Sequence, residues 1–399
     1  MLIKRKEFIQ VGSLATASVL VPKFLKAFET PLPVPKGNKV VVVLQLSGGN
    51  DGLNTVIPYR NDLYYKARPR LGIERGNALS LTDETGLHPS LTGFKELFDD
   101  GSLSILNNVG YPNPDRSHFR SMDIWHAASQ SNEYWTTGWL GRYLDAQCSG
   151  CDKPTQALEL DDVLSLALKG EELRGIAMKD PRRLFGTANE KFFREVMKEH
   201  QKQDDERPVE YLYKTMAETL SSADYIFKQS RLHPTNATYP QTGLGNSLKT
   251  IASLIFSDIN TRVYYVSLGS FDTHVNQGPQ QQRLFTEMND AVSAFVKDLK
   301  QQGKFDDVLL FTFSEFGRRV QQNASGGTDH GTANNMFFIS GGLKQKGVLN
   351  AMPDLSDLTE DDLKHQVDFK SVYATILNKW LEADDKSILK KDYQHLSFI

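Results

Sequence analysis

The sequence has few cysteines, no excess of positive charge and no long uninterrupted apolar segment. Of its 399 residues only two are cysteine, and the formal net charge is -3. A general nucleic-acid binder would carry a basic stripe, and the sequence has none. The apolar stretch 11–21 is too short to span a bilayer as a mature helix. With 39% hydrophobic and 24% charged residues, no internal repeat and no low-complexity tract, the composition is that of a soluble globular protein with ample core.

The two cysteines, Cys148 and Cys151, form a single CxxC motif. In an oxidising compartment this pair would close a small disulfide loop, and in the cytosol it would suggest a redox site or half of a metal site. A zinc site needs a second pair of ligands, which a lone CxxC lacks. The motif therefore favours a structural loop or free thiols, and we assign it no function.

The N-terminal residues 1–37 have the layout of an export signal and linker: a basic start, a mild apolar stretch and a proline-rich connector. The segment KRKEFIQ resembles the twin-arginine export motif, with Lys6 in place of the second arginine. We expect a protein exported to the periplasm or the cell exterior, with N-terminal membrane association before the signal is cleaved. No cleavage site stands out, which leaves retention as an anchor open. An ordinary amphipathic helix is the alternative.

Apolar, β-branched runs end repeatedly in glycine, serine and acidic residues, with helical stretches between them. The clearest runs are 39–54, 102–113, 262–274 and 307–319. Near-continuous apolar runs are typical of strands buried on both faces, so the pattern predicts a mainly parallel sheet covered by helices.

We expect one α/β domain over residues 38–399, although the length alone leaves the number of domains open. The charged range from about 155 to 235, rich in helix formers, predicts a helical insertion. In such a sheet, functional residues gather beyond the carboxyl ends of the strands.

Acidic and imidazole side chains recur at these expected strand ends. Asp272 and His274 are two positions apart, and alternate residues of an extended chain point to the same side, so one ion would contact both. Carboxylates and imidazoles gathered in this way are ligands for one or two divalent ions such as zinc, manganese or magnesium. The candidate metal ligands are Asp51, Asp272, His274, Glu315, Asp329 and His330.

Each candidate also has a structural alternative. An aspartate in a glycine-rich turn, such as Asp51, usually caps a helix or bends the chain. A single buried histidine is more often a hydrogen-bonded core residue than a ligand, and Arg318 would pair with Glu315 or lie in solvent. Recurrence of the same ligand types at four strand ends or adjoining loops favours the metal site.

The segment PDRSHF follows the second apolar run and predicts the start of a helix. Ser117 is a candidate cap and also a candidate nucleophile, because backbone N–H groups at a helix start hold anions. Arg116 or Arg120 would clamp the oxygens of a bound anion. His118 is a candidate ligand or acid/base group, whereas His126 on an apolar helix is expected to pack.

Several motifs together resemble a known family. GGNDGLN, PDRSHFRSMDIW, FDTHVNQ, TFSEFGRRVQQN and GTDHGTANNMFFISGG occur in order and are similar to those of the bacterial domain of unknown function fifteen-oh-one. The resemblance extends over residues 38–382. It implies membership in the alkaline-phosphatase-like superfamily, with a three-layer α/β/α sandwich, one or two divalent ions and a Ser, Thr or modified Cys nucleophile.

Within that resemblance, Asp51 matches the first-strand aspartate of the superfamily, and Ser117 falls near its nucleophile. Asp272 and His274 resemble an Asp-x-x-x-His ligand pair at closer spacing. Glu315 stands where many relatives have Asp-His, so that one imidazole is missing. The late histidine ligand corresponds to His330, with Asp329 beside it.

Two functions from different classes follow from these patterns. The first is a metal-dependent hydrolase of phosphate or sulfate esters, acting on a small-molecule or polymer substrate. The second is a non-catalytic exported binding or scaffold protein that retains the fold.

Overall fold

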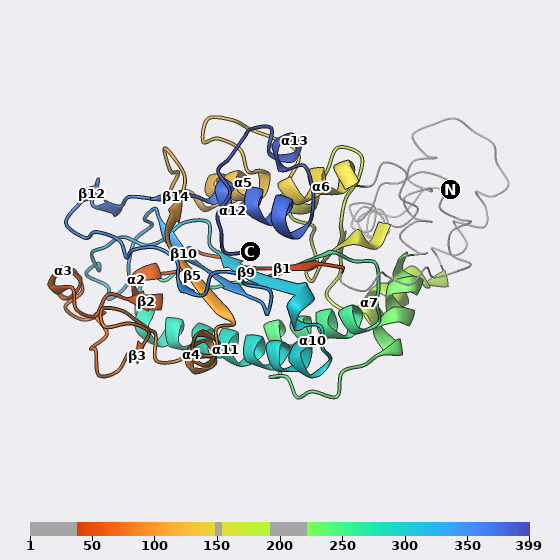
Figure 1. The fold of residues 1–399 in the computed structure, drawn as a ribbon, viewed down its shortest axis with the longest axis horizontal. Coiled ribbons are helices and arrows are strands. Elements are labelled where there is room, and N and C mark those ends of the chain that lie inside the picture. Colours follow the sequence, from red (N-terminus) through yellow and green to blue (C-terminus); the bar gives the residue numbers. More distant parts are fainter. Residues whose placement is uncertain (1–37, 148–153, 192–221) are drawn as a thin grey trace.

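The computed structural model describes residues 38–147, 154–191 and 222–399. The expected export signal and linker at 1–37, and both Cys148 and Cys151, lie outside these ranges. Within them, none of the helices is both long enough and apolar enough to cross a membrane. The described chain forms one large sheet between two layers of helices (Figure 1).

The large sheet has nine strands in the described ranges, in the order β11-β5-β10-β9-β1-β8-β6-β7, with β14 paired to β5. β1 pairs in parallel with β8 on one side and β9 on the other. β10 is an exception, because it runs antiparallel to both β9 and β5. The strands are β1 (Val40–Leu46), β5 (Leu103–Gly110), β6 (Ala157–Glu159), β7 (Ile176–Ala177), β8 (Val263–Leu268), β9 (Val308–Phe313), β10 (Asn334–Ile339), β11 (Gly347–Val348) and β14 (Val367–Asp368). The prediction of a mainly parallel sheet is confirmed.

β1 shows why helices must cover both faces of this sheet. All of its residues are buried, and successive side chains of a strand point to opposite faces. Val42 and Leu44 join one hydrophobic cluster, whereas Val41 and Val43 join another. A run of valines therefore supplies two cores at once.

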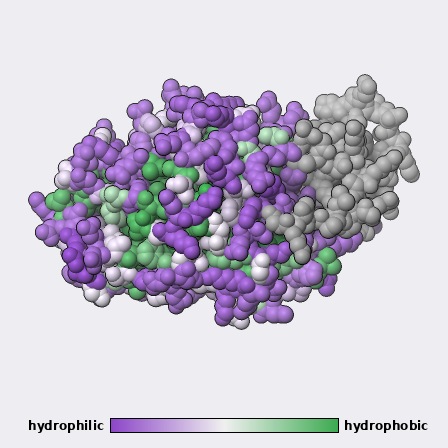
Figure 2. Space-filling view, in the orientation of Figure 1, coloured by the Kyte–Doolittle hydropathy of each residue, from purple (hydrophilic) through white to green (hydrophobic). Residues whose placement is uncertain are grey.

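The helices divide between these two clusters. One layer consists of α4 (Thr92–Asp99), α10 (Gly243–Phe256) and the long α11 (Gln277–Gln301). The other consists of α5 (His118–Ala127), α6 (Trp139–Gln147), α12 (Phe369–Thr375) and α13 (Asp385–Leu389). Figure 1 shows the two layers on either side of the sheet, which confirms the three-layer α/β/α prediction. On the face shown in Figure 2, hydrophobic residues gather over the sheet, between largely hydrophilic helical layers.

The first part of the range expected to form a helical insertion, from about 155 to 235, contains strands. β6 and β7 lie within 155–191 and extend the large sheet beside β8. A helix follows only at α7 (Pro181–Ala188), where Asp180 caps the first turn. These two segments are strands rather than the expected helices, because β6 pairs with β8 and β7 pairs with β6. Residues 192–221 of the expected insertion lie outside the described ranges.

Short elements surround the ends of the central strands. They are α2 (Gly52–Thr55), β2 (Val56–Ile57), α3 (Asp62–Ala67), β3 (Leu79–Ser80), β4 (Gly86–Leu87), β12 (Leu358–Thr359), β13 (Asp362–Leu363) and the π-helix η5 (Ile376–Trp380). β2, β4 and β3 form a small sheet, and β12 pairs with β13 as a hairpin. The hairpin turns through Glu360 and Asp361, which both have positive φ angles.

Candidate metal centre

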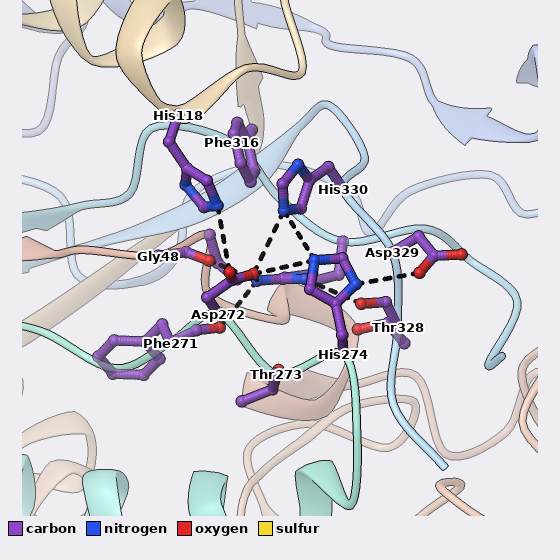
Figure 3. A network of polar contacts seen from close by, with 12 residues as sticks. Gly48, His118, Phe271, Asp272, Thr273, His274, Phe316, Thr328, Asp329 and His330 are labelled. Carbon is purple, nitrogen blue, oxygen red and sulfur yellow. Dashed lines mark hydrogen bonds and ion pairs between the residues drawn. The ribbon is translucent and has the colours of Figure 1, made fainter. Parts of the chain in front are cut away.

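Three loops meet beyond the carboxyl ends of β5, β8 and β9. β5 and β9 each run antiparallel to β10, so their carboxyl ends lie at the same edge as that of β8. The loop after β8 carries Asp272 and His274, and the chain after β9 carries Glu315 and His330. His118, the first residue of α5, completes the group. Figure 3 shows the side chains of His118, Asp272, His274 and His330 turned toward one another.

Asp272 is the centre of this group. Its Oδ1 lies 3.1 Å from Nε2 of His274 and 3.2 Å from Nε2 of His330. Its Oδ2 lies 3.5 Å from Nε2 of His118. The Arg318 guanidinium also donates to Oδ1 at 2.7 Å. One half-exposed carboxylate is thus surrounded by imidazole rings from three segments.

A glycine makes this arrangement of the backbone sterically accessible. Gly48, in the turn after β1, has a φ of +118°, and a Cβ at this position would lie 2.4 Å from the backbone N of Asp272. Only glycine combines that backbone conformation with so close an approach. Gly48, in the segment GGNDGLN, therefore allows the loop after β8 to lie against the end of β1.

The three imidazoles share one orientation. Nδ1 of His118 faces a carboxylate oxygen of Glu315 at 2.9 Å, and Nδ1 of His274 faces Asp329 at 3.1 Å. Nδ1 of His330 faces the carbonyl oxygen of Arg116 at 2.8 Å. Each of these partners accepts a hydrogen bond, so each Nδ1 carries a proton, and a ring in its neutral form presents the lone pair of Nε2 to Asp272.

Lone pairs that face one another repel unless a cation or proton lies between them. Nε2 of His274 and Nε2 of His330 are 2.9 Å apart, and both face Asp272. Nε2 of His118 is buried and has no hydrogen-bond partner in the described chain. This donor set fits a divalent cation, and the partners on Nδ1 match the outer-shell groups that orient metal-binding histidines.

The described residues contain one group of potential metal ligands, formed by His118, Asp272 and His330, whose ligand atoms lie within 4.8 Å of one another. His274 lies directly beside the group through Asp272 and His330. Three imidazole nitrogens and one carboxylate are a typical ligand set for zinc, and nitrogen ligands disfavour magnesium.

The charges at the centre favour a cation. Partial burial alone would raise the pKa of Asp272, but the hydrogen bond and the positive charge of Arg318 outweigh it and hold that pKa at about 2. Burial lowers the pKa of His330, which favours its neutral, ligating form. The hydrogen bond to Glu315 raises the pKa of His118. An ionised carboxylate beside a neutral imidazole is the state that metal binding requires.

Glu315 is not among the grouped ligand atoms. Its carboxylate is buried, and the same oxygen accepts from the backbone N–H of Gly48 at 2.8 Å and from His118. The expected alternative pairing of Glu315 with Arg318 is not observed, because Arg318 donates to Asp272 and to carbonyl oxygens of Gly49 and Thr328. Glu315 orients an imidazole, and Arg318 fixes the carboxylate.

Asp51 occupies a different environment. It is 2% exposed, and its Oδ2 accepts from the Arg68 guanidinium and from Gln277, each at 2.5 Å. Gln277 in turn accepts from Thr328 at 2.6 Å. The predicted role of Asp51 as a ligand is therefore not seen. Asp51 instead ties the end of β1 to the start of α11 and to the loop that carries Asp329 and His330.

The predicted nucleophile, Ser117, and the predicted anion-binding residues, Arg116 and Arg120, lie beside the centre, but they do not contact the grouped ligand atoms. Ser117 precedes His118 as the exposed N-cap of α5, and its hydroxyl makes no capping hydrogen bond. The Arg116 guanidinium bonds Asp362 at 2.5 Å. Arg120 donates to carbonyl oxygens of the loop after α5, including that of Ser131 at 2.8 Å. Both arginines are thus held by protein groups.

Comparison with known families decides what kind of chain this is. A family model described as "Protein of unknown function (DUF1501)" matches residues 38–394. The chain belongs to the DUF1501 family. No curated protein matches this DUF1501 chain significantly.

Solved structures with similarity to this DUF1501 chain come from several bacteria. The PsFucS1 sulfatase from Pseudoalteromonas sp. is 11% identical, with 98% of this chain and 75% of that chain covered and a TM-score of 0.39. A protein in the alkaline phosphatase superfamily from Vibrio parahaemolyticus is 10% identical, with 99% and 77% covered and a TM-score of 0.37. The C-terminal periplasmic domain of EcEptC from Escherichia coli, in complex with Zn, is 11% identical, with 78% and 77% covered and a TM-score of 0.36.

Sequence reasoning left the roles of two residues at the centre undecided. From the sequence, His118 is a candidate ligand or acid/base group. In the structure it is the first residue of α5, and its Nδ1 faces Glu315. Arg318 had been considered only as a partner of Glu315 or as a solvated residue. Its location within the sequence TFSEFGRR gives no signal that it reaches Asp272, because that contact depends on the turn at Gly48 and Gly49.

Proposed function

We propose that this protein is an exported metal-dependent hydrolase of phosphate or sulfate esters. The observation that supports the proposal most strongly is the convergence of three Nε2 atoms on Asp272, each ring held through Nδ1. His118, Asp272 and His330 would hold a single divalent ion, with His274 as a further ligand or as a proton carrier. Zinc fits the nitrogen-rich set better than manganese, and magnesium fits it least.

A divalent ion bound there would supply Lewis-acid stabilisation of the negative charge that develops on ester oxygens. The remaining chemistry falls to residues of the chain. Ser117 is the proposed nucleophile, because its hydroxyl is exposed at the start of α5 and is not used for capping. The backbone N–H groups of that helix start favour a bound anion.

The pair formed by His274 and Asp329 is suited to moving a proton. The His274 side chain is 40% exposed, and its Nδ1 is held by Asp329 at 3.1 Å. A carboxylate that holds one ring nitrogen fixes the tautomer and leaves the other nitrogen to exchange a proton with a reacting group. In the proposal, Nε2 of this imidazole accepts the proton that the Ser117 hydroxyl loses on attack and passes it to the leaving-group oxygen.

Replacing the nucleophile tests the proposal. Ser117→Ala is expected to abolish turnover of phosphate and sulfate esters while metal content and thermal stability stay unchanged. Ser325→Ala, at another exposed serine in a neighbouring loop, serves as the matched control and is expected to retain full turnover. Unchanged turnover in Ser117→Ala would remove Ser117 from the mechanism.

A non-catalytic exported binding protein is the second candidate. One observation favours it: the Arg120 guanidinium donates to protein carbonyl oxygens, including that of Ser131, rather than being left to hold a substrate anion. A wild-type protein that binds a stoichiometric ion but cleaves no ester in a broad panel would support this candidate over the hydrolase.

A further inference from the structure

A pocket of about 530 Å³ adjoins the candidate metal centre. Phe316 lines the pocket, and its ring also packs against the rings of His118 and His330, with centroids 4.9 and 4.6 Å away. Arg116 lines it as well, while the carbonyl oxygen of the same residue accepts from His330. The volume lies within the range of small-molecule sites, which is roughly 300 to 1,000 Å³.

Two residues that line the pocket have buried donors without partners in the described chain. One is the indole N–H of Trp125, a residue that is 2% exposed. The faces of this indole are covered by Phe313 and Phe369, at centroid distances of 5.1 and 4.1 Å. An indole N–H group lies in the plane of its ring, so neither of these stacked rings provides an acceptor for it.

The other unpartnered donor is Nε of Arg116. A terminal nitrogen of the same guanidinium is bonded to Asp362 at 2.5 Å and to Glu360 at 3.1 Å. These two carboxylates hold the arginine in place without using Nε. A buried donor left without an acceptor costs about 1–3 kcal/mol, so two such donors at one pocket point to a ligand with acceptor atoms.

The rest of the lining sets the character of that ligand. Tyr111, Phe316 and Leu363 provide apolar surface. Lys364 also lines the pocket, with its ammonium paired to Asp357, and burial lowers the pKa of the lining residue His365. The acidic residue in the lining, Glu360, already faces Arg116. An acceptor beside the unpartnered Nε of the Arg116 guanidinium is favoured when it carries negative charge.

We propose that this pocket binds a small organic oxyanion. Its oxygen atoms accept hydrogen bonds from Trp125 and Arg116, and its apolar or aromatic body lies against Phe316 and Leu363. The inference goes beyond the proposed hydrolysis, because the donors that carry it belong to the pocket and not to the metal centre. Binding there is expected whether or not an ester is cleaved nearby.

Calorimetric titration of the full-length, metal-loaded protein with benzoate tests this site. We expect saturable binding of benzoate and much weaker binding of the neutral analogue benzyl alcohol. Trp125→Phe keeps an aromatic ring between Phe313 and Phe369 but removes the N–H group, and it should weaken benzoate binding at least about tenfold. Trp139→Phe, at a buried tryptophan stacked on Tyr373 and outside this lining, is the control and should leave the affinity unchanged.

Further variants separate this pocket from the metal centre and guard against misfolding. Leu363→Trp, which fills the pocket, should abolish binding even if Trp125→Phe does not fold. The double variant Asp272→Ala/His330→Ala should still bind benzoate. Loss of binding in that double variant, an unchanged affinity in a folded Trp125→Phe protein, or no binding of benzoate to the wild type would each overturn the proposal.

Discussion

Asp51 and Asp272 follow neighbouring parallel strands, β1 and β8, and both belong to acidic motifs after apolar runs. Asp51 is 2% exposed and bonded to Arg68, whereas the Asp272 side chain is 47% exposed and faces imidazoles. The same local pattern thus leads to an internal ion pair in one case and to a candidate ligand in the other. Partners from distant segments decide between the two roles.

The ion pair of Asp51 with Arg68 shows how the centre is supported. Arg68 also donates to the carbonyl oxygens of Val320 and Arg319, each at 2.9 Å. This contact fixes the chain that follows Arg318, while Gln277 links Asp51 to Thr328. Asp51 therefore acts on the centre through the backbone that carries the ligands.

The largest expected effect is on stability, and it should differ between replacement of Asp51 and replacement of Asp272. Asp51→Ala leaves a fully buried arginine charge without its partner and should lower the free energy of unfolding by about 3–5 kcal/mol. Asp272→Ala should lower it by only about 1 kcal/mol, because the Asp272 side chain is 47% exposed and water screens its pairing with Arg318. Urea denaturation of the two variants measures both values. Equal destabilisation would contradict the division of roles.

A smaller effect is expected on metal affinity. It is tested at two carboxylates that accept from histidines, Glu315 and Asp329. Glu315→Gln replaces a buried acceptor of His118 and should weaken metal binding roughly 10- to 100-fold. Asp329→Asn should weaken it less, because the Asp329 side chain is 56% exposed and water can replace it. Competition with a chelator gives both affinities. The reverse order would show that His274, rather than His118, dominates binding.

The smallest expected effect concerns His126, which lies on α5 together with His118 but in the interior. Burial lowers the pKa of His126 to about 3, and its Nε2 lies 3.0 Å from the hydroxyl of Tyr265. The unfolded chain binds a proton near pH 6.5, whereas the folded chain stays neutral until about pH 3. The stability contribution of this residue is therefore complete above pH 6.5 and is lost as the pH falls from there toward 3.

Unfolding free energies at pH 7 and pH 5 test this contribution. The wild type should lose more stability between these values than His126→Gln, in which no imidazole titrates at this position. His88, whose pKa burial lowers to about 4, is present in both proteins and cancels from the comparison. Equal losses would mean that His126 is protonated in the folded protein. The expectation from sequence that His126 packs in the interior agrees with its burial.

The main strands and the layers of this fold were predictable because the signal is local. Consecutive valines in β1 imply burial on both faces, and β5, β8 and β9 have comparable runs. The short strands β6 and β7 were missed because segments of three and two residues carry too little pattern. They are defined only by pairing, β6 with β8 and β7 with β6.

The candidate site was predictable only in part. The spacing of Asp272 and His274 and the segment with Asp329 and His330 indicated ligands at one edge of the sheet, and these residues do meet. The role of Asp51 was not predictable, because it depends on Arg68 at the end of another short helix. Which histidine nitrogen faces the centre also depends on contacts across nearly two hundred positions, as between His118 and Glu315.

Metal content tests the central claim most directly. Elemental analysis of full-length protein purified without chelator should find about one divalent ion per chain, most readily zinc. The ion should be absent from the double variant His118→Ala/His330→Ala and present in Asp51→Asn, which replaces the internal aspartate with an amide of the same shape. No bound ion in the wild type even after incubation with zinc or manganese, or an ion retained by the double variant, would contradict the account.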